Sequence, residues 1–206
     1  MITLYGYPQT RSTRASWALE ETGAEYTFKP INLRAGEHRS DEYLSLNPFG
    51  KVPTLIDDEL VMYESAAICT YIAEKFPESR LIPTESQARA AYFQWLLFSV
   101  TELESHLWLA AKHSRILPEE KRIPAIIALE TEAFQHASII LAGRLQHHQY
   151  LAGDQFTAAD IMCVSVLNWA IAMKIALNPA VAEYRKRICD RPALARARQR
   201  EADSIA

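Results

Sequence analysis

The chain has 206 residues, which is enough for one large domain or two modest ones. Hydrophobic residues make up 49% of the chain and charged residues 23%, as in ordinary soluble globular proteins. The net charge of −3 leaves no basic surplus, so the composition disfavours nucleic acid as the main partner.

The first part of the chain alternates strand and helix signals. Residues 2–5 are a short β-prone run, and residues 12–22 carry helical periodicity that ends at Gly23, a residue type that often closes helices. Residues 26–31 predict a second strand, so the chain opens with a β-α-β unit. A short helical turn led by residues 40–42 follows.

Two further strands are predicted at residues 52–56 and 60–62, on either side of an acidic turn. Residues 65–76 form the next predicted helix, which Pro77 closes. The order β-α-β followed by β-β-α, with a proline at the start of the third strand, predicts a thioredoxin-like domain over residues 1–80.

No strand signal follows residues 81–86, which we interpret as a linker. Residues 87–113 carry one apolar stripe at helical spacing, and another helix is expected to start near Pro118 and run to Gly143. The fold class is therefore an α/β domain followed by an all-α domain, a helical bundle over residues 87–206.

The last third contains three helix-start signals. Thr157 and Asp160 form a capping box, in which Thr157 caps an amide and Asp160 reaches back. Pro179 and Pro192 suit the first position of two further helices. We interpret Thr157 and Asp160 as folding determinants rather than catalysts.

The three cysteines, Cys69, Cys163 and Cys189, are far apart and show no metal-ligand spacing. An odd number of isolated cysteines argues against a disulfide framework and fits a reducing compartment. Residues 1–25 lack a signal peptide, and the apolar stretch at 161–177 is shorter than the ~20 residues of a spanning helix. We expect a cytoplasmic protein with no metal and no membrane partner.

Three motifs occur in one register along the chain. They are Asn-Pro-Phe-Gly-Lys-Val-Pro-Thr-Leu at 47–55, Tyr-Glu-Ser-Ala-Ala-Ile at 63–68 and Phe-Thr-Ala-Ala-Asp-Ile at 156–161. Over its whole length the chain resembles the cytosolic glutathione transferase superfamily, closest in motif to the bacterial serine- and cysteine-type theta, zeta and beta-like classes. The resemblance implies an enzyme that activates the glutathione thiol for attack on a small electrophile, with glutathione as co-substrate and a homodimeric assembly.

The resemblance also implies which residues bind glutathione, a ligand with two carboxylates, one ammonium and a thiol. A cis Val52-Pro53 bond would leave the backbone of Val52 free to pair with the cysteinyl backbone of the ligand. Ser65, as helix N-cap, is expected to form an anion site for the γ-glutamyl carboxylate, and Glu64 to pair with the ammonium. Lys51 and His38 are expected to meet the glycyl carboxylate.

Activating the thiol requires a hydrogen-bond donor near the sulfur. A cysteine thiol titrates near ~8.5, and one hydrogen bond to its charged form, about 1.5–3 kcal/mol, lowers that pKa by ~1–2 units. The donor is expected within residues 5–14, where the patterns of the family classes diverge. Thr10 or its backbone amide ranks first, Ser12 second and Tyr5 third. No cysteine precedes Cys69, which argues against a mixed disulfide at this loop.

The electrophile is expected to bind between the two domains. The expected lining residues are Tyr7, His106, Trp108 and Leu109. For Trp108, ordinary core or dimer packing stays an open alternative. Thr101-Glu102-Leu103 resembles a segment that reaches a neighbouring subunit in some bacterial classes, so Glu102 of the partner subunit is an expected ligand of the glutathione ammonium.

Several functions remain open from the sequence alone. The same hydroxyl site would suit a glutathione-dependent disulfide reductase or peroxidase, or an isomerase that adds and expels glutathione. A non-enzymatic alternative is a glutathione-binding scaffold or stress protein. The presence of Lys51, Glu64 and Ser65 favours a working binding site. The identity of the electrophile is not readable from the sequence.

Overall fold

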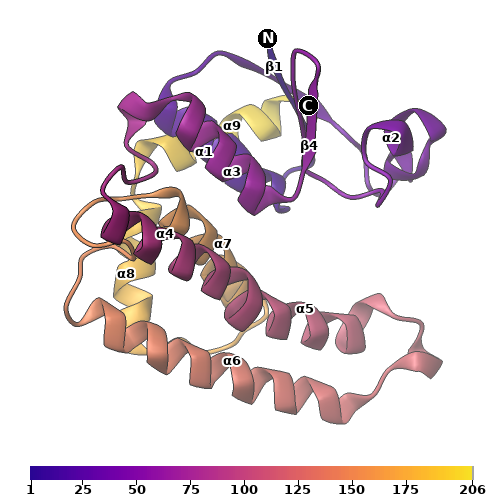
Figure 1. Ribbon diagram of the computed structural model, residues 1–206. Helices are drawn as coiled ribbons and strands as arrows, with labels where there is room; N and C mark the ends of the chain where they lie inside the picture. Colours follow the sequence, from indigo (N-terminus) through magenta and orange to yellow (C-terminus); the bar gives the residue numbers. More distant parts are fainter. Residues whose placement is uncertain (206) are drawn as a thin grey trace. The chain divides into compact units, whose positions relative to one another are not determined.

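The computed structural model describes residues 1–205 and contains two compact units (Figure 1). One unit comprises Met1–Ile82 together with the chain from Asp190 onward, and the other comprises Pro83–Cys189. The expected helical domain, residues 87–206, included the C-terminal segment, which the structure instead packs with the first unit.

A mixed four-stranded sheet forms the centre of the first unit. Its strands are β1 (Ile2–Gly6), β2 (Tyr26–Pro30), β3 (Thr54–Asp57) and β4 (Leu60–Tyr63). They lie in the order β2-β1-β3-β4, with β1 parallel to β2 and the other neighbours antiparallel. This arrangement confirms the thioredoxin-like fold that the sequence predicts.

The helices of this unit are α1 (Ser12–Thr22), α2 (Asp41–Leu46), α3 (Ser65–Lys75) and α9 (Pro192–Asp203). Helix α1 packs against both α3 and α9 (Figure 1). It ends at Gly23, whose φ of 70° is left-handed, as predicted. Ser40 caps helix α2, since its hydroxyl accepts a hydrogen bond from the Tyr43 amide at 3.2 Å. The predicted helical turn is therefore also confirmed.

Strand β1 places α1 very close to the sheet. Leu4 and Gly6 face the buried side of β1, whereas Tyr5 faces the other side. A Cβ atom at Gly6 would lie 2.7 Å from Ser12 Cβ and 2.8 Å from the Phe28 ring. Only glycine therefore fits where the start of α1 crosses the end of β1.

Acidic residues of α1 hold the C-terminal helix. Glu20 accepts hydrogen bonds from Arg196 and Arg200, each at 2.9 Å. Glu21 accepts two from Arg191, at 2.6 and 2.7 Å. Because these partners lie at opposite ends of the chain, local sequence patterns gave no sign that α9 joins the sheet-bearing unit.

The second unit is helical throughout its regular elements. Its helices are α4 (Ser86–Phe98), α5 (Ser105–Ala111), α6 (Pro124–Leu145), α7 (Ala158–Ala172) and α8 (Pro179–Cys189). The predicted helix from Pro118 begins at Pro124 instead, because a 3-10 turn at Glu119–Lys121 intervenes and Pro124 takes the first helical position.

The predicted continuous helix at 87–113 is interrupted by two π-helical segments, Ser99–Glu104 and Lys112–Ile116. The hydroxyl of Ser99 donates to the Trp95 carbonyl at 2.8 Å, and that of Thr101 donates to the Leu97 carbonyl at 3.1 Å. These hydroxyls compete with backbone amides for helix carbonyls, which is a known cause of helix distortion. The apolar stripe predicted helix correctly but carried no sign of this change in pitch.

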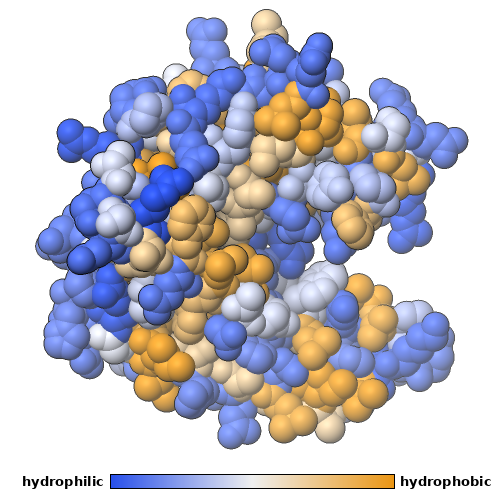
Figure 2. Space-filling model, viewed as in Figure 1, coloured by the Kyte–Doolittle hydropathy of each residue, from blue (hydrophilic) through white to orange (hydrophobic). Residues whose placement is uncertain are grey.

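Helix α6 is the one helix in the described residues 1–205 long and apolar enough to cross a membrane by length and composition. Core helices of soluble proteins meet the same criterion. Phe134, Ala137 and Leu141 are buried in the unit, whereas Leu129 and Ile140 are exposed. Figure 2 shows apolar surface along this helix, at the bottom of the view. From the sequence, residues 161–177 were the most apolar candidate, so α6 was not predicted to meet this criterion.

Candidate functional site

The turn before β3 has the geometry that the sequence predicts. The Val52-Pro53 peptide bond is cis. The Lys51 carbonyl accepts hydrogen bonds from the Tyr43 hydroxyl at 2.6 Å and from Asn47 Nδ2 at 2.7 Å. Within residues 1–205 the Val52 backbone forms no hydrogen bond, so its amide and carbonyl remain open to a ligand.

Tyr43 and Asn47 were not predicted as site residues, although they fix this turn. The side chains of both also reach Thr54 Oγ1, at 2.9 and 3.2 Å. Burial raises the pKa of Tyr43, so its phenol stays a neutral donor. Asn47 belongs to the motif at 47–55. Tyr43 lies just before this motif, and no local sequence pattern marked its role in the turn.

Helix α3 begins differently from the prediction. Glu64 occupies the N-cap position with φ 76° and ψ 105°, and Ser65 is the first helical residue. The Ser65 hydroxyl accepts a hydrogen bond from Arg14 Nη1 at 3.0 Å rather than from a helix amide. The prediction that Ser65 caps the helix was therefore wrong, because a long-range guanidinium takes the hydroxyl.

This start of α3 still suits an anion. The first amides of a helix lack intrahelical partners, and the helix dipole favours negative charge there. The Arg14 guanidinium adds a positive charge beside Ser65. A positive φ at a residue such as Glu64 costs about 1–3 kcal/mol and is typical of binding sites. Glu64 itself is exposed and available to a ligand.

The loop between β1 and α1 brings together two of the three predicted thiol activators. The Thr10 hydroxyl donates to the Tyr7 carbonyl at 2.7 Å, and its oxygen lies 2.9 Å from Ser12 Oγ. The Ser12 amide donates to Thr10 Oγ1 and the Tyr7 amide donates to Ser12 Oγ, each at 3.2 Å. Thr10 is half-buried and Ser12 fully buried, so Thr10 is the more accessible hydroxyl.

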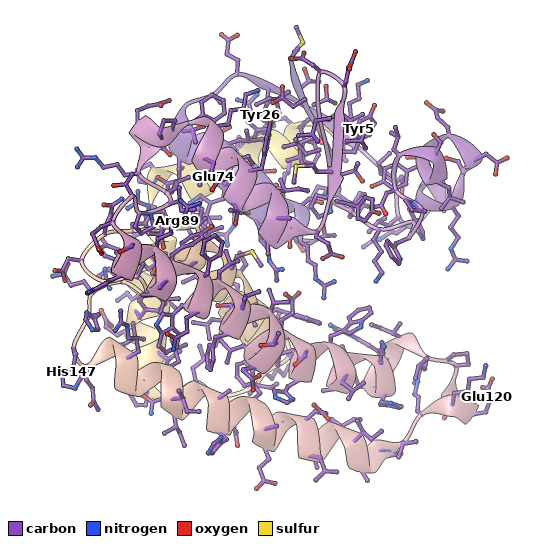
Figure 3. The ribbon with its side chains drawn as sticks, viewed as in Figure 1. Tyr5, Tyr26, Glu74, Arg89, Glu120 and His147 are labelled. Atoms are coloured by element: carbon purple, nitrogen blue, oxygen red, sulfur yellow. The ribbon has the colours of Figure 1, made fainter. Side chains whose placement is uncertain are left out.

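Tyr5 lies apart from this pair of hydroxyls. Its ring packs against Tyr43 with centroids 6.2 Å apart, and Lys29 Nζ lies 5.4 Å from the ring centroid. Figure 3 shows Tyr5 on the sheet of this unit. Since Gly6 faces Ser12, the alternation along β1 directs the Tyr5 side chain away from the start of α1.

The structure brings the two predicted ligands of the glycyl carboxylate into neighbouring turns. Gly50 has φ 57°, and a Cβ atom there would lie 2.8 Å from the His38 carbonyl oxygen. Lys51 follows directly and is exposed, with Nζ 5.9 Å from the Phe49 ring centroid. Among the described residues, His38 Nδ1 is a buried atom without a hydrogen-bond partner.

Two family models match the chain. The glutathione S-transferase N-terminal domain matches residues 1–74, and the glutathione S-transferase C-terminal domain matches residues 113–192. The chain belongs to the glutathione S-transferase family. Most of α9 lies beyond both matched ranges.

Relatives of this glutathione S-transferase chain cover nearly its full length. Glutathione S-transferase F13 of Arabidopsis thaliana is 34% identical over 207 residues, which is 93% of this chain and 92% of that protein. Disulfide-bond oxidoreductase YfcG of Escherichia coli K12 is 31% identical over 209 residues, 96% of this chain and 94% of that protein. The predicted superfamily is confirmed, whereas the class within it stays a prediction.

A solved structure gives the same result for the fold. Glutathione transferase URE2P6 from Phanerochaete chrysosporium, determined in complex with oxidized glutathione, has a TM-score of 0.85 and 26% sequence identity to this chain. The match covers 98% of this chain and 97% of that one. The predicted combination of a thioredoxin-like domain and a helical domain is therefore confirmed.

The remaining predicted residues lie on the helical unit of this glutathione S-transferase chain. On α5, His106 Nδ1 lies 2.7 Å from Glu130 Oε2, and the Trp108 ring packs against Trp169 with centroids 6.4 Å apart. Leu109 is half-buried, and Glu102 is exposed in the π-helical segment. The grouping of the α5 residues with Tyr7 in one electrophile pocket stays a prediction.

Two of the three cysteines have the environment of structural residues. Cys69 and Cys163 are fully buried, and burial raises the pKa of the Cys69 thiol to about 12 and that of Cys163 further. Thiols held neutral in this way are poor nucleophiles. Within residues 1–205 no group of three or more His, Cys, Asp or Glu side chains has an arrangement that could hold a metal ion.

Proposed function

We propose that this glutathione transferase activates the thiol of glutathione with the Thr10 hydroxyl and passes the thiolate to a small electrophile. The observation that carries the proposal is the position of Thr10 at the amino end of α1, accessible and held by Tyr7 and Ser12. When glutathione binds, the Thr10 hydroxyl turns from the neutral Tyr7 carbonyl to the thiolate. The thiolate is the better acceptor because charge-assisted hydrogen bonds are roughly twice as strong as neutral ones.

In this mechanism the protein supplies position and charge stabilisation. The thiol proton leaves to solvent, and the thiolate remains at the amino end of α1, where the helix dipole also favours an anion. The sulfur then forms a bond to the electrophilic carbon. In a substitution the displaced electron pair departs with the leaving group; in an addition the electron pair of the attacked double bond moves to the neighbouring atom, which takes a proton from solvent. Ser12 contributes by fixing the Thr10 oxygen through its amide.

Glutathione itself is proposed to bind along the edge formed by β3 and α3. The open Val52 backbone pairs with the cysteinyl residue in the manner of an added strand. The amides at the start of α3, with Ser65 and Arg14 behind them, receive the γ-glutamyl carboxylate. Glu64 pairs with the ammonium, and the neighbouring turns that carry His38 and Lys51 receive the glycyl carboxylate.

Glu64→Gln is expected to weaken glutathione binding about threefold while kcat changes less than about twofold, since one exposed ion pair, worth up to about 1 kcal/mol, is lost. Calorimetric titration with glutathione measures the affinity, and initial rates give KM and kcat separately. Glu59→Gln, an equally exposed acid in the turn before β4, is the matched control. Equal affinity of Glu64→Gln and wild type would remove Glu64 from the proposed site.

A disulfide reductase is the second candidate, favoured by the relative named Disulfide-bond oxidoreductase YfcG. Both reactions start from the same thiolate and neither needs a protein cysteine. We expect higher kcat/KM with an activated aryl halide than with a small disulfide, measured at equal glutathione concentration. A ratio reversed by more than tenfold would assign the chain to reduction instead.

We also propose a cytoplasmic homodimer in which Glu102 of the partner subunit meets the glutathione ammonium. Exposed apolar side chains on the helical unit, among them Leu97 on α4 and Ile140 on α6, support the presence of a subunit interface. Sedimentation at micromolar concentration is expected to give twice the chain mass. A monomer with full activity would refute the role of Glu102.

A further inference from the structure

The C-terminal helix carries a buried carboxylate beside the loop that holds Thr10. Glu201 on α9 is only 1% exposed. Its Oε2 accepts the Thr13 hydroxyl at 2.9 Å and its Oε1 accepts the Ser16 hydroxyl at 2.8 Å. Thr13 and Glu201 are 188 residues apart, so local sequence patterns gave no sign of this contact.

The Thr13 amide donates to the Thr10 carbonyl at 3.2 Å, so the residue that Glu201 holds is itself bonded to Thr10. Gln9 has φ 59°, a left-handed conformation that residues with a side chain rarely adopt. The loop before α1 is therefore held in a conformation that its own residues do not favour. Gln9 directly precedes Thr10, so its backbone sets the direction from which the Thr10 hydroxyl enters the site.

The carboxylate is held where it is needed by the rest of α9. The pairs of Arg196 and Arg200 with Glu20 fix the helix on α1 one turn beyond Ser16. Burial raises the pKa of Glu201 to about 7, although the hydroxyls of Ser16 and Thr13 and the charge of Arg198 oppose that shift. A carboxyl group kept in so unfavourable a place, and bonded to two hydroxyls in the first two turns of α1, has a more specific task than packing.

We propose that Glu201 is a positioning residue, which holds Thr13 and through it the Thr10 hydroxyl in the orientation that stabilises the glutathione thiolate. This inference rests on the proposed role of Thr10. It assigns a part of the catalytic arrangement to the last helix of the chain.

Glu201→Leu removes every acceptor at nearly the same volume, and kcat is expected to fall roughly tenfold with KM for glutathione changed less than about twofold. Glu201→Gln keeps one carbonyl oxygen for the Thr13 hydroxyl and is expected to recover most of kcat. The pKa of enzyme-bound glutathione, followed by thiolate ultraviolet absorbance, should rise in Glu201→Leu and return towards wild type in Glu201→Gln. Asp203→Leu, exposed on the same helix, is the matched control.

A merely structural role would lower the melting temperature of Glu201→Leu but leave kcat per folded molecule and the bound thiol pKa unchanged, and that result overturns the proposal. If Glu201→Leu does not fold, Glu201→Asp is used instead, because it shortens the side chain by one methylene group. A folded Glu201→Asp protein with wild-type kcat would also overturn the proposal. Thr10→Val is measured in parallel. If it leaves the thiol pKa unchanged, the proposed activator is wrong; if it alone raises that pKa, only the positioning role is wrong.

Discussion

Thr10→Val is expected to lower kcat/KM about 10- to 100-fold, because it removes a hydrogen bond to a charged group, about 1.5–3 kcal/mol. Valine keeps the shape of threonine and the backbone amide. In the folded protein the Thr10 hydroxyl contacts the Tyr7 carbonyl and Ser12, and neither is left charged by the change. Because the buried Ser12 amide also loses its acceptor, some stability is lost as well, and kcat/KM is compared per folded molecule.

The pH dependence of Thr10→Val provides a second test. A hydrogen bond that stabilises the thiolate lowers the thiol pKa, so its loss raises that pKa by ~1–2 units. The rising limb of the kcat/KM profile should move to higher pH by the same amount. Thr10→Ser should restore the wild-type profile, and Tyr5→Phe should leave it in place. An unmoved profile in Thr10→Val, with activity intact, would transfer the role to the Thr10 amide or to another donor.

Features encoded locally were predicted well from the sequence. The cis Val52-Pro53 bond, the C-terminal Gly23 of α1, and the capping box at Thr157 and Asp160 each depend on residues within one turn of one another. Residue type alone marks the helix-closing glycine and the capping box, whereas the cis bond was expected from the family resemblance. The same local motifs identified the family, which is why the fold and the activity followed from them.

Features that depend on distant partners were not predicted. Ser65 has the residue type of an N-cap, but Arg14 takes its hydroxyl from another helix. The last helix contains several arginines and reads as a solvated charged helix, whereas Glu20 binds two of them and Glu201 turns inward. Local patterns cannot show which charges will meet, because a buried charge is stable only with partners that the fold supplies.

Distant partners also decided which candidate hydroxyl is available for chemistry. Thr10 and Ser12 are two residues apart and equally polar, so the sequence ranked them only by family pattern. The close approach of α1 to Gly6 buries Ser12 and leaves Thr10 accessible. Side chains alternate along β1, so Tyr5 points away from both hydroxyls. This follows from the period of a strand once the start of α1 is known to lie against Gly6.

Asp160→Ala is expected to lower the free energy of unfolding by about 3–5 kcal/mol, the range observed when a buried polar network loses its central acceptor. Asp160 is fully buried. It accepts hydrogen bonds from the Thr157 amide at 2.8 Å, the Leu151 amide at 3.0 Å and the Tyr184 hydroxyl at 2.6 Å. These bonds join the start of α7 to the preceding loop and to α8, so their loss leaves several donors unsatisfied at once.

Denaturant titration followed by circular dichroism measures this loss. Asp160→Asn keeps an oxygen for Leu151 and Tyr184 but turns an amide group towards the Thr157 amide, so a smaller loss of about 1–3 kcal/mol is expected. Asp154→Ala, exposed in the same loop, should change stability by less than about 0.5 kcal/mol. Because the network lies wholly inside the helical unit, kcat per folded molecule should stay at the wild-type value in Asp160→Asn. A folded Asp160→Ala protein of wild-type stability would show that the apolar packing of α7 suffices without its capping box.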